Sequence, residues 1–120
     1  MITRSESNLK IKENLLKSMK SLFLNEQDTL LMKSLKEFFP SISSAFIINC
    51  IPEQGEDIYW ILIDPKIVAI VEIPRSDNAD VKDVLIETHT VEKILQKPLT
   101  KGVRRELTAA LELAKQAEKT

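Results

Sequence analysis

The sequence predicts one α+β domain over residues 1–120, in which an antiparallel meander sheet of three or four strands packs with an N-terminal helical hairpin and a C-terminal helix. Apolar residues recur at helical spacing before residue 40 and after residue 100, and a strand-like apolar run lies between them. A chain of 120 residues with 43% hydrophobic and 29% charged residues has the size and composition of one globular domain. Helices flanking a run of strands are typical of the α+β class.

The first 40 residues predict two helices. Apolar side chains within residues 9–23 fall mostly on one helical face, and Ser7 or Asn8 is the expected N-cap. A second helix is expected from Asn25, which would cap it, to just before Pro40, because helical geometry is disfavoured at the residue before a proline. The short connection between the two predicts a helical hairpin.

The centre of the chain predicts an antiparallel sheet with apolar side chains on both faces. Strands are expected over residues 45–51, 58–63 and 67–73, with a polar loop over residues 52–56. The turn Asp64-Pro65-Lys66 is too short for a parallel crossover, so the strands on either side of it are antiparallel. Near-continuous apolar strands need a cover on both faces. The covers are expected to be the protein's own helices or another protein.

The last third of the chain predicts a fourth strand and two more helices. Residues 84–88 are interpreted as a strand, with part of a helix as the alternative. A short helix is expected over residues 90–97, closed before Pro98. Thr100 is then expected to cap the final helix, whose apolar residues form one stripe.

The acidic residues concentrate in the sheet segment. Residues 41–100 contain ten acidic and five basic side chains, whereas the segments on either side have a small basic excess. An acidic centre disfavours nucleic acid as a partner, because phosphate binding depends on Lys and Arg. It favours a basic protein partner. The alternative interpretation is an acidic surface that is simply solvated.

No complete catalytic or cofactor motif is present. The chain has one cysteine, Cys50, and one histidine, His89, so we expect no intrachain disulfide, no metal site and no cofactor. Cys50 is expected to be a small buried hydrophobe. No apolar run is long enough for a membrane helix and no signal peptide is recognised, so we expect a cytoplasmic protein that does not bind membranes.

One hairpin resembles the PD-(D/E)xK nuclease family. Asp57 opens a strand, and the next strand ends Val71-Glu72-Ile73-Pro74-Arg75. The resemblance implies that Asp57 and Glu72 would hold Mg²⁺. The family's catalytic lysine is replaced here by Pro74, and a guanidinium such as that of Arg75 does not exchange its proton as an amine does. A degenerate metal-dependent nuclease is therefore the alternative function.

In size, acidity and lack of a catalytic motif, the chain resembles small bacterial toxin-immunity proteins of the contact-dependent growth inhibition type. This resemblance implies a non-enzymatic protein that binds a basic, nuclease-like toxin and occludes its active site with an acidic surface. A homodimeric structural module that pairs sheets or edge strands is a third hypothesis. Tyr59 and Trp60 must point to opposite faces of their strand, and either could contact a partner. The candidate partner-binding residues are Glu53, Glu56, Asp57, Asp64, Glu72, Asp77 and Asp80.

Overall fold

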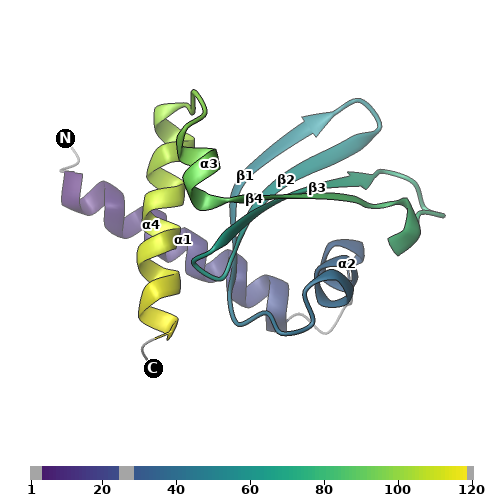
Figure 1. Ribbon diagram of the computed structural model, residues 1–120, viewed down its shortest axis with the longest axis horizontal. Helices are drawn as coiled ribbons and strands as arrows, with labels where there is room; N and C mark the ends of the chain where they lie inside the picture. Colours follow the sequence, from purple (N-terminus) through teal and green to yellow (C-terminus); the bar gives the residue numbers. More distant parts are fainter. Residues whose placement is uncertain (1–3, 25–28, 119–120) are drawn as a thin grey trace.

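A computed structural model describes residues 4–24 and 29–118, and it has the α+β architecture that the sequence predicts (Figure 1). Within these residues, every helix is too short or too polar to cross a membrane. In chain order the elements are α1 (Arg4–Leu24), α2 (Leu30–Phe38), β1 (Ala45–Glu53), β2 (Glu56–Ile63), β3 (Ile67–Pro74), the 3-10 turn η1 (Val81–Asp83), β4 (Leu85–Thr90), α3 (Val91–Leu95) and α4 (Lys101–Glu118).

The sheet is a four-stranded antiparallel meander with the order β1-β2-β3-β4. The fourth strand is thus confirmed, and its register with β3 runs without a shift from Ile67↔Thr90 to Glu72↔Leu85. The β1–β2 register shifts once, between Ile47 and Asn49, which marks a β-bulge. Both outer strands, β1 and β4, have one paired neighbour in the sheet.

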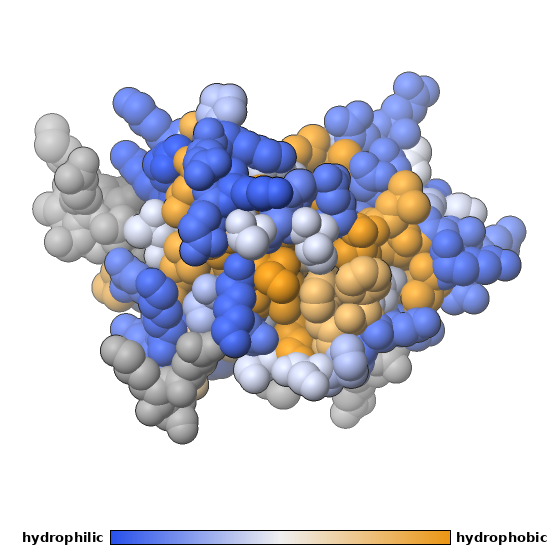
Figure 2. Space-filling model, viewed as in Figure 1, coloured by the Kyte–Doolittle hydropathy of each residue, from blue (hydrophilic) through white to orange (hydrophobic). Residues whose placement is uncertain are grey.

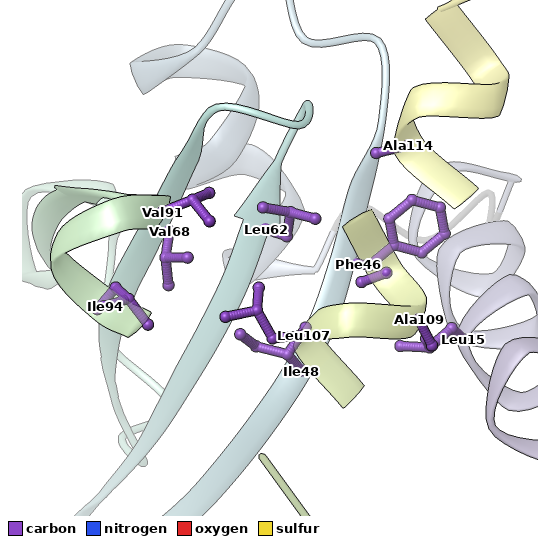
Figure 3. Close-up of a cluster of buried hydrophobic side chains, with 11 residues drawn as sticks. Leu15, Phe46, Ile48, Leu62, Val68, Val91, Ile94, Leu107, Ala109 and Ala114 are labelled. Carbon is purple, nitrogen blue, oxygen red and sulfur yellow. The ribbon is translucent and has the colours of Figure 1, made fainter. Parts of the chain in front are cut away.

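Helices cover both faces of the sheet, as the two-sided apolar strands require. Residues of α1, α3 and α4 pack with Phe46, Leu62 and Val68 on one face (Figure 3). Leu31 and Leu35 of α2 pack on the other face. The two N-terminal helices therefore lie on different faces: α1 lies with α4 on the first, and α2 lies on the second (Figure 1). The two helices follow each other as expected, but they do not pack together as a helical hairpin, because the apolar stripe of each packs on a different face of the sheet.

The β1–β2 hairpin is longer than the polar loop over residues 52–56 predicts. The strands pair as far as Glu53↔Glu56, and only Gln54 and Gly55 form the turn. Gly55 has φ 84°, as the third residue of a type II turn requires, and only glycine adopts this conformation at no steric cost. Both glutamates therefore lie on strand ends and are held directly opposite each other.

Threonines cap three of the helices. The side chains of Thr90 and Thr100 accept hydrogen bonds from the backbone N–H groups of Lys93 and Val103, which confirms the expected cap of α4. Thr29 caps α2 in the same way, at 3.1 Å from the Met32 N–H. The expected cap Asn25 lies outside the described residues.

The expected start of α1 differs from the structure. The helix begins at Arg4, so Ser7 and Asn8 lie within it and neither is its N-cap. Both residue types are acceptable inside a helix at modest cost, which is why a capping pattern alone places the start too late.

Candidate protein-binding surface

The face of the sheet that carries α1, α3 and α4 is covered over only half its length. Leu62 of β2 and Val68 of β3 are fully buried under these helices. Towards the other end of the same strands, Trp60, Ile58 and Ile70 on this face are only half-buried. Figure 1 shows the three helices gathered at one end of the strands, with the β1–β2 hairpin projecting beyond them. We call the uncovered part the open face.

Register and side-chain alternation define which residues the open face contains. Cross-strand partners share a face, and so do residues two apart along a strand. Its apolar members are half-buried or exposed, with Leu85 65% and Ile51 36% exposed. Its charged members are all carboxylates. The full set is Ile51, Ile58, Trp60, Ile70 and Leu85 with Glu53, Glu56, Glu72 and Glu87.

Three of the four carboxylates of the open face lack cationic partners. Among the described residues, the side chains of Glu53, Glu56 and Glu72 make no ion pair and no hydrogen bond. Glu53 and Glu56 are directly opposed across the hairpin, an arrangement in which like charges destabilise a sheet. The free protein therefore keeps a repulsive acidic pair at the tip of an apolar strand surface.

Leu85 and Glu87, the two residues that β4 contributes to the open face, are not among the expected binding residues. The sequence leaves residues 84–88 open between a strand and a helix. Without the register of β4 it therefore does not predict on which face of the sheet these two side chains lie. Nε2 of the neighbouring His89 lies 2.9 Å from Oε1 of Glu87. The direction of the ring nitrogen does not allow a hydrogen bond, so Nε2 is buried without one, and the contact is a close approach of the two groups.

Asp57 lies on the opposite face, where it is neutralised within the chain. It pairs with Ile73 in the register, and its Oδ1 accepts hydrogen bonds from Nη2 and Nε of Arg75 at 2.7 and 3.1 Å. The hydrogen bond and the charge of Asp57 raise the pKa of Arg75. This expected binding residue is therefore engaged in a local ion pair.

The same register separates the two carboxylates of the nuclease alternative. Asp57 and Glu72 point to opposite faces of the sheet, so they do not converge on one metal ion. Within the described part of the chain, no three Asp, Glu, His or Cys residues are grouped so that they could hold a metal. The hairpin resembles that of the nuclease family in sequence spacing but does not bring its two acids together.

Tyr59 and Trp60 separate as adjacent strand residues must. Trp60 belongs to the open face and packs against the cluster of α1 and α4, whereas Tyr59 packs against the α2 side. Burial raises the pKa of Tyr59, and the neighbouring Cys50 and Asp57 raise it further. Cys50 itself is exposed, contrary to the expectation of a buried hydrophobe. It lies beyond the β1 bulge, where α2 no longer covers the sheet.

The remaining expected binding residues lie away from the open face. Asp64 is at the other end of β2, and its Oδ1 accepts the backbone N–H groups of Ser43 and Ser44 at 3.0 and 2.9 Å. Asp77 is exposed in the β3–β4 connection. Asp80 caps η1, with its Oδ1 2.7 Å from the Val81 N–H. The seven expected acids therefore do not form one surface: Glu53, Glu56 and Glu72 share the open face, and the other four do not.

A hollow of about 410 Å³ lies elsewhere, between α1 and α4. Its charged lining is mostly basic, and Lys12 of α1 pairs with Glu112 of α4 at 2.6 Å. The basic lining of this hollow thus lies away from the carboxylates of the open face. Because its walls are cationic, this hollow does not suit a basic partner. Its charged residues are Lys12, Lys101, Arg104, Arg105 and Glu112.

Comparisons of the chain with protein-family models, with curated proteins and with solved structures find no match.

Proposed function

We propose that this protein is a non-enzymatic binding module that docks a basic protein through its open face. The observation that carries the proposal is the combination of an uncovered apolar sheet surface with three carboxylates, those of Glu53, Glu56 and Glu72, that have no cationic partner in the described chain. Exposed apolar patches rimmed by polar residues are typical of protein-binding sites. An interface centred on Trp60 would follow the general preference for aromatic anchors surrounded by a polar rim.

The chemistry of the rim favours a basic partner. Bringing Lys or Arg side chains to Glu53 and Glu56 would replace a repulsive cross-strand pair by attractive ones. Such pairs also accelerate encounter at low ionic strength. Binding of a basic partner would therefore relieve the repulsion between Glu53 and Glu56, which favours affinity, and the opposite charges would also raise the association rate.

Within this class we propose an immunity or antitoxin role. The resemblance in size and acidity to bacterial toxin-immunity proteins supports it. A nuclease-like toxin must bind phosphate groups with Lys and Arg, and carboxylates on a projecting hairpin can occupy such a site in place of the nucleic acid. Neutralisation would take place in the cytoplasm, where such a toxin meets its substrate.

The test uses purified proteins encoded by the reading frames next to this gene. Binding of each to the full chain is measured by biolayer interferometry at increasing NaCl concentration, together with inhibition of any nuclease activity that the neighbour has. We expect one neighbour to bind with an affinity that falls as salt rises. Glu53→Lys with Glu56→Lys should weaken that binding by about tenfold or more, equivalent to about 1.4 kcal/mol.

Asp77→Lys combined with Glu37→Lys is the matched control, because it makes the same total charge change at two exposed acids outside the open face. It should leave the affinity within about twofold, a change of less than about 0.5 kcal/mol. Equal losses for the control and the Glu53/Glu56 variant would refute docking at the open face. Binding that is unaffected by salt would refute a basic partner.

A further inference from the structure

The two edges of the sheet differ in how they are protected from pairing with another strand. The β1 edge has a bulge between Ile47 and Asn49 and a proline at position 52, and α1 packs alongside the strand. Bulges, prolines and covering helices are devices that prevent edge-to-edge association. The β1 edge therefore has three of them.

The β4 edge has none of these devices. Its six residues, Leu-Ile-Glu-Thr-His-Thr, contain no proline and no lysine, and their register with β3 is regular throughout. Exposed apolar side chains lie on this strand and beside it. Leu85 is 65% exposed, and Phe38 of α2 is 55% exposed and lines a hollow of about 270 Å³ against Ile86 and η1. Figure 2 shows hydrophobic surface in the part of the view that β4 crosses in Figure 1.

We infer that β4 pairs with β4 of a second copy of this chain, antiparallel across a two-fold axis, to form a continuous eight-stranded sheet. Self-pairing of identical antiparallel edges places the axis normal to the sheet, so each face continues into the same face of the second copy. The inference rests on the edge strand and not on the hairpin carboxylates Glu53 and Glu56, although Leu85 and Glu87 of β4 also belong to the open face.

Charge complementarity selects the register. Opposed residues must share a face, so the axis passes through a residue, and the two central choices are Glu87 and Thr88. An axis at Glu87 would oppose two carboxylates, which is destabilising. An axis at Thr88 opposes the two threonines and places each Glu87 across from His89 of the second copy. This second register also pairs Ile86 with Thr90 and brings the exposed Leu85 to the start of the other copy's α3.

The first experiment measures the mass of the full chain in solution by sedimentation equilibrium. We expect twice the 13.7 kDa of one chain. Thr88→Lys should raise the dimer dissociation constant by about tenfold or more, because it opposes two lysines at the axis. Thr108→Lys, the same change at an exposed position of α4, should leave it unchanged. Circular dichroism checks that both variants are folded.

The second experiment tests the register by cross-linking. In a Cys50→Ser background, Thr88→Cys should form a disulfide-linked dimer under mild oxidation, because opposed residues in a sheet have Cβ atoms about 4.5–5.5 Å apart. Thr108→Cys in the same background should not. A monomeric wild-type chain would overturn the inference, and so would a dimer that survives Thr88→Lys and does not cross-link in the Thr88→Cys variant. Neither result would bear on binding of a basic partner at Glu53 and Glu56.

Discussion

Asp64 shows that a carboxylate in an acidic segment can have a purely structural role. It accepts two backbone N–H groups from Ser43 and Ser44, and its own N–H donates to the Ser44 carbonyl at 2.9 Å. Its φ of 51° is in the left-handed region, which Asp and Asn tolerate better than most residues. These bonds join the start of β1 to the end of β2.

Replacing Asp64 should therefore affect stability and not partner binding. Asp64→Ala should lower the free energy of unfolding by about 1–3 kcal/mol, because two N–H groups lose their acceptor. Asp64→Asn keeps an acceptor oxygen and the left-handed conformation, so it should lose less. Urea unfolding measures both. An Asn variant as unstable as the Ala variant would show that the negative charge, and not the acceptor, is what matters.

Glu106 of α4 has a charge that the fold disfavours. Burial raises its pKa above the ordinary 4.5, and it lies beside Asn14 and Ser18 of α1. Below the ordinary pKa, the carboxyl is protonated in both folded and unfolded chains and has no linkage effect. As the pH rises above that value, the unfolded chain ionises more readily, so the folded state loses stability until the raised pKa is passed.

Glu106→Gln should therefore raise the unfolding temperature at neutral pH. The gain in stability should be under about 1 kcal/mol, because the side chain is only half-buried and solvent screens it. It should disappear when the pH is lowered below the ordinary glutamate pKa. Thermal unfolding across this pH range measures it, with Glu13→Gln as the control, because Glu13 is exposed and has no ion pair among the described residues. A gain that does not change with pH would rule out ionisation as its cause.

At the scale of single residues, the sequence predicts contacts between near neighbours in the chain better than contacts across the sheet. Thr100 is predictable as a cap because the hydrogen bond that defines it spans three residues. The Asp57–Arg75 pair spans 18 residues and depends on the β2–β3 register, so no local pattern indicates it. The sheet register also decides which acidic side chains share a face. The sequence therefore could not predict that three of the seven expected binding acids lie on the open face and four do not.

Among the elements, α2 has a disproportionate role for its nine residues. Within the described chain, it is the helix that covers the second face of the sheet, through Leu31 and Leu35. So short a helix is not stable in isolation and depends on its cap and its packing. Ser34 within it is also buried, and its hydroxyl donates to the Leu30 carbonyl at 2.8 Å.

Thr29→Ala should lower the free energy of unfolding by about 0.5–2 kcal/mol, because the Met32 N–H loses its capping acceptor. Thr29→Ser, which keeps the hydroxyl, should lose much less. Chemical denaturation followed by circular dichroism measures both changes. If the Ser variant is as unstable as the Ala variant, the methyl group of Thr29 rather than its cap would be the important contact.

The strands are largely predictable from the sequence, whereas their ends are not. The run over residues 57–73 is apolar on both faces, and the tight turn at Pro65 allows only antiparallel pairing, so β2 and β3 follow directly. The sequence pattern makes both strands of the β1–β2 hairpin too short, because Pro52 and Glu56 are typical of loops. In the structure, cross-strand pairing extends the hairpin as far as Glu53 and Glu56 despite these residues.

Over the whole molecule, two hydrophobic clusters share one sheet. Leu107 belongs to the cluster under α1, α3 and α4, and Leu35 belongs to the cluster under α2; both side chains are fully buried. The sequence predicts two covered faces but cannot assign each helix to a face, because an amphipathic stripe fits either one. That assignment is also what determines where the open face lies.

We expect the two clusters to unfold together. Leu35→Ala should lower the free energy of unfolding by about 2–5 kcal/mol, and Leu107→Ala by a similar amount. Trp60 fluorescence reports on the side opposite to Leu35, and circular dichroism reports on the whole chain. In the Leu35→Ala variant both signals should shift to the same lower denaturant midpoint. A Trp60 transition that stays at the wild-type midpoint would show that the two faces unfold separately.

The single thiol, that of Cys50, allows the protein to be attached to a surface at one defined site. Cys50 is exposed and shares the side of Tyr59, so it projects away from the carboxylate-bearing surface of the hairpin. Since the chain contains one cysteine, maleimide chemistry would attach it to a sensor chip in a single orientation. Molecules immobilised through this sulfur would all present Glu53 and Glu56 to the solution.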